Sequence, residues 1–87
     1  MDFTARLRLH FTDHALDQMQ KRGFSRADVA AIVGAPEVTY FGVDGKYNVC
    51  GTSASGRARV VLVLQSDLAI VITVIRLSKE IINENQT

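Results

Sequence analysis

The second half of the sequence contains four stretches typical of β-strands, with only short turns between them. "EVTYFGV" and "KYNVCGT" flank Asp44-Gly45, a pair that favours a tight hairpin, and "RARVVLVLQ" and "LAIVITVIRL" are separated by Ser66 and Asp67. Strands joined by turns this short pair with their sequence neighbours in antiparallel fashion. This half of the chain therefore predicts a four-stranded antiparallel meander.

The first half predicts one strand and two short helices. "ARLRLHF" alternates apolar and polar residues, which is the pattern of a half-buried strand. Thr12 or Asp13 can cap a helix that runs to Arg22, where Gly23 provides a stop. A second helix begins at "SRAD", which has the spacing of a capping box, and ends at "GAP".

Length and composition indicate a single globular domain. The chain has 87 residues, of which 47% are hydrophobic and 22% are charged, a balance that argues against disorder and allows one core. We expect an α+β fold in which the two helices pack on one face of a twisted antiparallel sheet of four to five strands. The domain would occupy residues 1–87, with its core at about 6–77 and a polar C-terminal tail at 78–87.

Charge and cysteine content exclude several classes of protein. The formal net charge of +1 gives no overall basic field, so an anion site would need local clustering of cations. Cys50 is the one cysteine, which excludes an internal disulfide, and no Cys/His spacing resembles a zinc site, so we expect no metal and no cofactor. "LAIVITVI" is too short to cross a bilayer, and no charged leader precedes an apolar run, so we expect a cytoplasmic protein.

Three two-residue loops, at 44–45, 55–56 and 66–67, would fix the register of the meander and divide its side chains between two faces. One face is nearly all apolar and should pack on the helices; it carries Val38, Tyr40, Tyr47, Val49, Ala58, Val60, Leu62, Leu64, Ala69, Val71, Thr73 and Ile75. The other is apolar at one end and cationic at the other; it carries Phe41, Asn48, Cys50, Thr52, Arg57, Arg59, Val61, Val63, Ile70, Ile72, Val74 and Arg76.

In this register three arginines gather at one end of the sheet. Arg57 lies opposite Arg76, with Arg59 beside them, and like charges in such positions call for a counter-anion, either an acidic side chain or a phosphate. The apolar end of the same face needs a cover, for which a partner protein or a second copy is the simplest. A three-residue loop in place of a two-residue one would shift the partition and bring Thr73 to the arginines.

The order of these features resembles a small bacterial family, the domain of unknown function 4258. The likeness runs from the first strand through "HALDQMQKRGFS", an acidic helix start and a Gly/Pro break to a meander ending "VITVIRL", about residues 6–77. The characteristic run of that family is His-Ala, then Met, then Arg-Gly, then a branched or aromatic residue. The matching residues here are His14, Ala15, Met19, Arg22, Gly23 and Phe24.

That family looks like a member of the RelE/ParE-like group, and more broadly of the barnase, EndoU and colicin-nuclease group, in which two N-terminal helices pack on an antiparallel sheet. The resemblance implies a metal-independent ribonuclease or translation-linked toxin, usually paired with an antitoxin. RelE-like toxins vary widely in their catalytic residues, and some relatives inhibit gyrase instead of cutting RNA.

Metal-free RNA cleavage needs a base for the 2′-hydroxyl proton, a cation for the pentacoordinate phosphate and an acid for the leaving oxygen. His14, Arg22 and Arg59 are the catalytic candidates, with His14 as base or acid because histidine titrates near neutral pH. The alternatives are that His14 packs at the helix start and that Arg22 stabilises its own helix dipole. His10, on the polar side of the first strand, is a second acid/base candidate or an exposed edge residue.

Arg57 and Arg76 are candidate substrate contacts, since guanidinium groups bind phosphate bidentately. The alternative for both is an ion pair with a protein partner. Tyr47 could stack on a base or act as an acid, or it could be a core aromatic.

Two functions from different classes follow. The first is a toxin that cuts or binds RNA, with a cognate antitoxin as its protein partner. The second is a non-catalytic interaction module, or a degenerate toxin, that uses the half-apolar, arginine-ended sheet face to dock a partner or a second copy of the chain.

Overall fold

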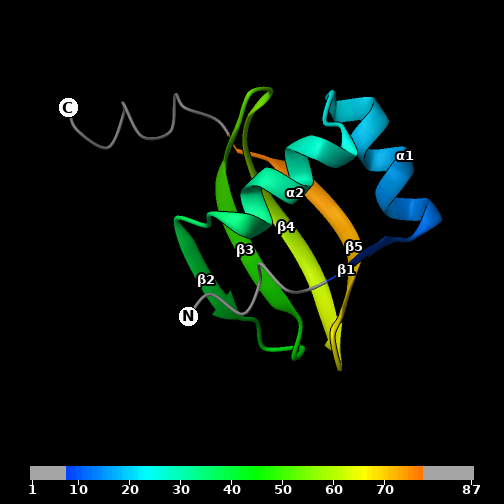
Figure 1. The fold of residues 1–87 in the computed structure, drawn as a ribbon, viewed down its shortest axis with the longest axis vertical. Coiled ribbons are helices and arrows are strands. Elements are labelled where there is room, and N and C mark those ends of the chain that lie inside the picture. The colour runs from blue at the N-terminus through cyan, green and yellow to red at the C-terminus, as the bar shows by residue number, and fades with distance from the viewer. Residues whose placement is uncertain (1–7, 78–87) are drawn as a thin grey trace.

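The computed structural model describes residues 8–77 and shows two helices on one face of a five-stranded sheet (Figure 1). The elements in chain order are β1 (Arg8–Phe11), α1 (Asp13–Arg22), α2 (Arg26–Gly34), β2 (Val38–Phe41), β3 (Tyr47–Ser53), β4 (Gly56–Gln65) and β5 (Leu68–Arg76). The α+β prediction is confirmed. The tail predicted at 78–87 and the first residues of the predicted N-terminal strand lie outside the described residues.

The strands lie in the order β1-β5-β4-β3-β2, with β1 and β2 at the two edges. The meander of β2 to β5 is antiparallel as predicted, whereas β1 pairs with β5 in parallel and makes the sheet mixed. The helices explain this arrangement, because α1 packs on β5 and α2 packs mainly on β3. Together they carry the chain from one edge of the sheet to the other, where the meander begins (Figure 1).

Local signals set both helices as the sequence predicts. The Thr12 side chain caps α1 by accepting from the Ala15 N–H at 3.1 Å, and Gly23, at φ 79°, ends the helix in the left-handed region. Ser25 and Asp28 form the predicted capping box of α2. Thr12 also ties α1 to the sheet, since its hydroxyl donates to the Val71 carbonyl at 3.1 Å.

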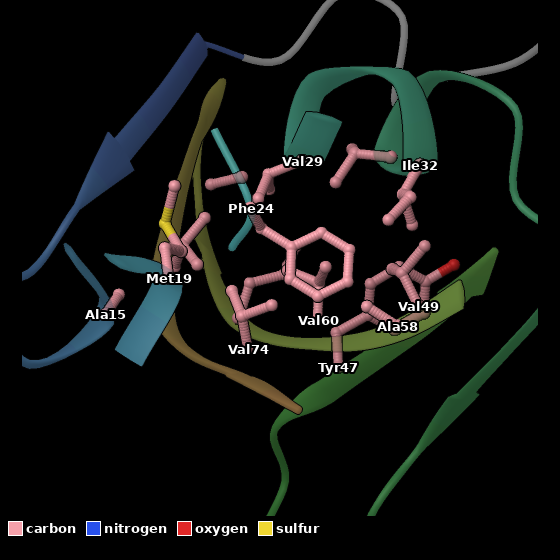
Figure 2. Close-up of a cluster of buried hydrophobic side chains, with 14 residues drawn as sticks. Ala15, Met19, Phe24, Val29, Ile32, Tyr47, Val49, Ala58, Val60 and Val74 are labelled. Carbon is pink, nitrogen blue, oxygen red and sulfur yellow. The ribbon is translucent and has the colours of Figure 1, made fainter. Parts of the chain in front are cut away.

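The core lies between the helices and the sheet face that they cover (Figure 2). Its largest fully buried side chains come from α2 and the three central strands, and Ala15 of α1 is fully buried as well, so the small domain has one continuous apolar layer. The largest are Ile32, Leu62, Val29, Val49, Val60, Val71 and Val74. We call this side of the sheet the covered face and the other side the open face.

The first hairpin departs from the predicted register. Gly42 donates to Lys46 at 2.9 Å and Gly45, at φ 80°, donates to Gly42 at 3.0 Å, so three residues rather than two form the turn. Phe41 therefore pairs with Tyr47, and the side chains of β2 exchange faces relative to the prediction. Val38 and Tyr40 lie on the open face, and Phe41 lies on the covered side.

The turn between β3 and β4 lies one residue earlier than predicted, and it shifts the pairing by two residues without exchanging faces. The turn at Ser66 and Asp67 has two residues, as predicted. A β-bulge then interrupts the β4–β5 ladder, because Leu62 pairs with Val71 whereas Val61 pairs with Thr73.

The bulge corrects the predicted faces of the end of β5. Val74 is fully buried on the covered face instead of lying beside the arginines. Thr73 and Ile75 lie on the open face, and Arg76 pairs with Ala58 rather than with Arg57. The predicted three-arginine cluster does not form, because Arg76 lies on the covered side.

Candidate functional site: a groove on the open sheet face

A groove of about 450 Å³ crosses the open face between the first hairpin and the bulge of β5. The groove is built from two adjacent rows of side chains that run across the strands. The first row consists of paired residues on four neighbouring strands, Tyr40, Asn48, Val61 and Thr73, and Arg59 belongs to the next row. We call it the Arg59 groove; its lining residues are Tyr40, Gly42, Val43, Asp44, Lys46, Asn48, Arg59, Val61, Ile72 and Thr73.

Arg59 is the cation of this groove that lacks a charged partner within residues 8–77. Its Nε atom is buried and makes no hydrogen bond, and its Nη1 atom donates to the Tyr40 hydroxyl at a long 3.4 Å. Burying part of a guanidinium group without an anion is unfavourable, and a bound anion would relieve that cost. Arg59 is thus arranged to receive an anionic group.

The rest of the groove combines an apolar floor with polar walls. Val61 and Ile72 contribute apolar side chains, and Thr73 contributes a hydroxyl. Asn48, which is 8% exposed, donates through its amide to the Lys46 carbonyl at 3.2 Å and so is fixed in place. This mixture suits a ligand with a flat, largely apolar part and an anionic part.

The hairpin turn places a second cation at the rim. The Lys46 amine lies 3.2 Å from Asp44, whose pKa is lowered by the backbone N–H of Lys46 and then by the Lys46 side chain. The ion pair gives Asp44 a cation of its own within the hairpin turn.

Arg57, one of the predicted phosphate contacts, already has an anion. Its Nη2 atom lies 3.0 Å from the Glu37 carboxylate, which also accepts from the Thr52 hydroxyl at 2.6 Å. The Thr52 hydroxyl, and then Arg57, lowers the pKa of Glu37. Arg57 thus meets the alternative expectation of an acidic partner, although that partner belongs to the same chain.

Arg76 has a structural position on the covered side. Its two Nη atoms donate to the Arg22 carbonyl at 2.6 Å and to the Ser55 carbonyl at 3.0 Å, and its guanidinium carbon lies 4.6 Å from the centre of the Phe24 ring. Arg76 therefore caps the C-terminus of α1 and joins it to the β3–β4 turn.

His14 and Arg22 are not brought to Arg59. Both lie on α1, over the covered face, whereas Arg59 points from the open face. His14 and Arg22 are eight positions apart, which corresponds to about 12 Å along a helix axis. His14 is exposed in the first turn, and no hydrogen bond to its imidazole occurs within residues 8–77.

The remaining predicted residues lie away from the groove. Tyr47 is buried in the core at 9% exposure, which agrees with the alternative of a core aromatic, and its ring lies 4.9 Å from that of Phe41. His10 is exposed on the edge strand β1 and lines a smaller hollow of about 310 Å³ with Leu9, Phe11 and Arg26.

Sequence reasoning found Arg59 but missed Tyr40, Asn48 and Thr73 as its neighbours. Tyr40 and Thr73 were assigned to the wrong face by the hairpin and bulge described above. The Asp-Gly pair signals a turn but not its length, which misplaced Tyr40, and no sequence signal marked the bulge that turns Thr73 outward. Asn48 had no signal beyond its place on the correct face.

No helix within 8–77 is long and apolar enough to cross a membrane. In the same range, no group of three or more His, Cys, Asp or Glu side chains is placed to hold a metal ion.

Comparison with known proteins gives one result. The family described as Domain of unknown function (DUF4258) matches residues 11–76, which include both helices and the whole meander. The family resemblance seen in the run from His14 to Phe24 is thereby confirmed. The searches of curated proteins and of solved structures found no match.

Proposed function

The chain belongs to the family DUF4258, and on that premise we propose that it is a RelE-like toxin that binds RNA in the Arg59 groove and cleaves it without a metal ion. The observation that carries the proposal is the partly buried guanidinium group of Arg59, which has no anion within residues 8–77. In RNA the phosphate would be that anion. The proposed site of action is cytoplasmic, and the proposed protein partner is an antitoxin.

The groove matches a nucleotide in size and in chemistry. Ligand sites usually measure about 300 to 1,000 Å³, and the Arg59 groove, at about 450 Å³, lies in that range. The Tyr40 ring stands beside Arg59 at one wall, so a base stacked on it would place its phosphate near the guanidinium group. Val61 and Ile72 would contact the same base from below.

The groove also offers the groups that metal-free cleavage requires. The 2′-hydroxyl loses its proton as its oxygen bonds to phosphorus, and the 5′-oxygen leaves with a proton. Arg59 would stabilise the pentacoordinate phosphate, the Asp44 carboxylate in the same groove would accept the proton of the 2′-hydroxyl, and the Lys46 ammonium group would give a proton to the leaving 5′-oxygen. This assignment moves the chemistry away from His14 and Arg22.

The test expresses wild type, Arg59→Ala, His14→Ala and, as a matched arginine control, Arg26→Ala in a bacterial host. We expect growth arrest and fragmented RNA with wild type, His14→Ala and Arg26→Ala, and normal growth with intact RNA for Arg59→Ala. Binding of a short single-stranded RNA, measured by fluorescence anisotropy, should weaken by about tenfold or more in Arg59→Ala, because a hydrogen-bonded phosphate contact is lost.

Loss of toxicity in His14→Ala but not in Arg59→Ala would place the catalytic site on α1 and would contradict the proposal that the Arg59 groove is the site. Tight RNA binding without cleavage by wild type would mean a degenerate toxin that retains the binding surface.

The second candidate is the protein-docking module. It is favoured by half-buried apolar side chains of the open face on both sides of the groove, Val63 and Ile70 on one side and Ile75 on the other. A protein with that function would bind no RNA in the anisotropy measurement. It would lose its partner when Val63 or Ile70 is replaced by lysine, without loss of the fold.

A further inference from the structure

The strand β2 presents an edge that no other strand covers in the described part of the chain, residues 8–77. It is the last strand of the sheet, all four of its residues are exposed, and three are large and apolar: Val38 at 53%, Tyr40 at 42% and Phe41 at 67% exposure. Edge strands are normally protected by lysine, proline, a bulge or a covering loop, and none of these residues or irregularities occurs within β2. Such an edge is suited to accept another strand.

The backbone of β2 shows which groups are available. Gly42 donates to Lys46, so residues 38, 40 and 42 bond to β3, because bonded and non-bonded pairs alternate in an antiparallel ladder. The N–H and C=O groups of Thr39 and Phe41 therefore point away from the sheet. Within residues 8–77 these four groups have no partner, and they form a free hydrogen-bonding edge.

We propose that β2 pairs in antiparallel fashion with β2 of a second copy of this chain, with Tyr40 on the two-fold axis. Thr39 of each copy then lies opposite Phe41 of the other, and every free N–H and C=O of these residues finds a partner, which gives four hydrogen bonds. If the two-fold axis passed through Thr39 or through Phe41 instead, the backbone N–H and C=O groups of the other residue would not both find partners. The two five-stranded sheets become one of ten strands.

The side chains agree with this register. Tyr40 meets Tyr40 of the second copy on the open face, at a non-hydrogen-bonded position where aromatic pairs come closest. On the other face Phe41, already held 4.9 Å from Tyr47, covers Thr39 of the second copy. Both are favourable cross-strand contacts.

Charge also permits self-pairing. Glu37 falls opposite Val43 rather than opposite another carboxylate. The two acidic residues that flank the strand are neutralised within their own chain, Glu37 by Arg57 at 3.0 Å and Asp44 by Lys46 at 3.2 Å. Two copies can therefore approach edge to edge without repulsion.

The test measures the mass of the full chain by light scattering and sedimentation from micromolar to millimolar concentration. We expect wild type to convert from one chain to two. Thr39→Pro removes an outward N–H from each copy, two of the four bonds, and should stay monomeric, whereas Thr39→Val keeps the N–H and should dimerise like wild type. Circular dichroism checks that each variant folds.

A charge-swap experiment tests the register without altering the backbone. Tyr40→Lys and Tyr40→Asp should each be monomeric, because like charges meet on the axis, and an equimolar mixture should form a heterodimer. A wild type that is monomeric throughout, or a dimer that survives Thr39→Pro and both Tyr40 variants, would overturn the proposal. A monomeric wild type would mean that the β2 edge is free to pair with a strand of a different protein. A dimer that survives all these substitutions would mean that the two copies meet at another surface.

Discussion

Three arginines of this small sheet, Arg57, Arg59 and Arg76, lie in three different electrostatic environments. Arg57 has a carboxylate, Arg76 has two carbonyl oxygens and an aromatic ring, and Arg59 has the hydroxyl of Tyr40 at the limit of hydrogen bonding. The first two arrangements stabilise the fold. The third costs free energy, because the Nε atom has lost its water without gaining a partner.

Replacing Arg59 by methionine should therefore leave the free energy of unfolding unchanged or raise it by up to about 1 kcal/mol, since a partly buried cation without a charged partner is exchanged for an apolar chain of similar length. Arg57→Met is the matched control and should lower the same quantity by about 1 kcal/mol or less, the usual worth of an exposed ion pair. Urea denaturation at neutral pH measures both. A clear loss of stability in Arg59→Met would show that the guanidinium group has a stabilising partner.

At the scale of the element, the bulge of β5 is the feature that most alters the surface. Before it, Ala69 and Val71 face the core; after it, Val74 does so, and the odd-numbered Thr73 faces outward. Both Val74 and Thr73 are β-branched, so neither propensity nor volume distinguishes them in the sequence. Their different burial follows the register, in agreement with the hydroxyl that only Thr73 carries.

This difference can be measured with a matched pair of substitutions. Val74→Ala should lower the free energy of unfolding by about 2 kcal/mol, because it removes two buried methyl groups and leaves a cavity. Thr73→Ala, one residue away on the open face, should change it by about 0.5 kcal/mol or less. Similar losses from both substitutions would mean that the ladder has no bulge at this point.

At the scale of the whole molecule, one carboxylate connects the helical layer to the sheet. Asp28 accepts from the backbone N–H of Ser25 at 2.8 Å, closing the capping box of α2, and from the Ser55 hydroxyl in the β3–β4 turn at 2.6 Å. The backbone N–H of Ser25 and then the hydroxyl of Ser55 lower the pKa of Asp28 from 3.8 to about 2. The folded state thus favours the ionised carboxylate.

Because the pKa of Asp28 is lower when folded than when unfolded, its contribution to stability is complete above about pH 5 and disappears as the pH falls through about 4 to 2. Asp28→Asn should therefore be less stable than wild type at neutral pH, and the gap between their free energies of unfolding should close on acidification to pH 2. Asp17→Asn, which removes an exposed carboxylate paired 3.1 Å from Lys21, controls for the loss of a surface charge. A gap that is constant with pH would contradict the role of Asp28.

Caps, turns and alternation were enough to predict two helices, the meander and most of the core, because each of these signals is local. Ser25 with Asp28 and Thr12 with Gly23 act within a few residues, and the structure confirms them. The parallel pairing of β1 joins residues some 60 positions apart, as in the bond from Thr12 to Val71, and no local signal encodes it. The groove was harder still to predict, since the position of its lining residues depends on the register of four strands at once.

The bulge of β5 amounts to the insertion of one residue into a regular strand. Ile72 is the extra residue of β5, and its removal would restore strict alternation while leaving Val71 inward, Thr73 outward and Val74 inward as they are now. A homologous protein that lacks the codon for Ile72 would keep the same core and the same two sheet faces. Its strand would lack the bend beside which the Arg59 groove lies. The site could thus be gained or lost by a single in-frame codon, without a substitution anywhere else in the chain.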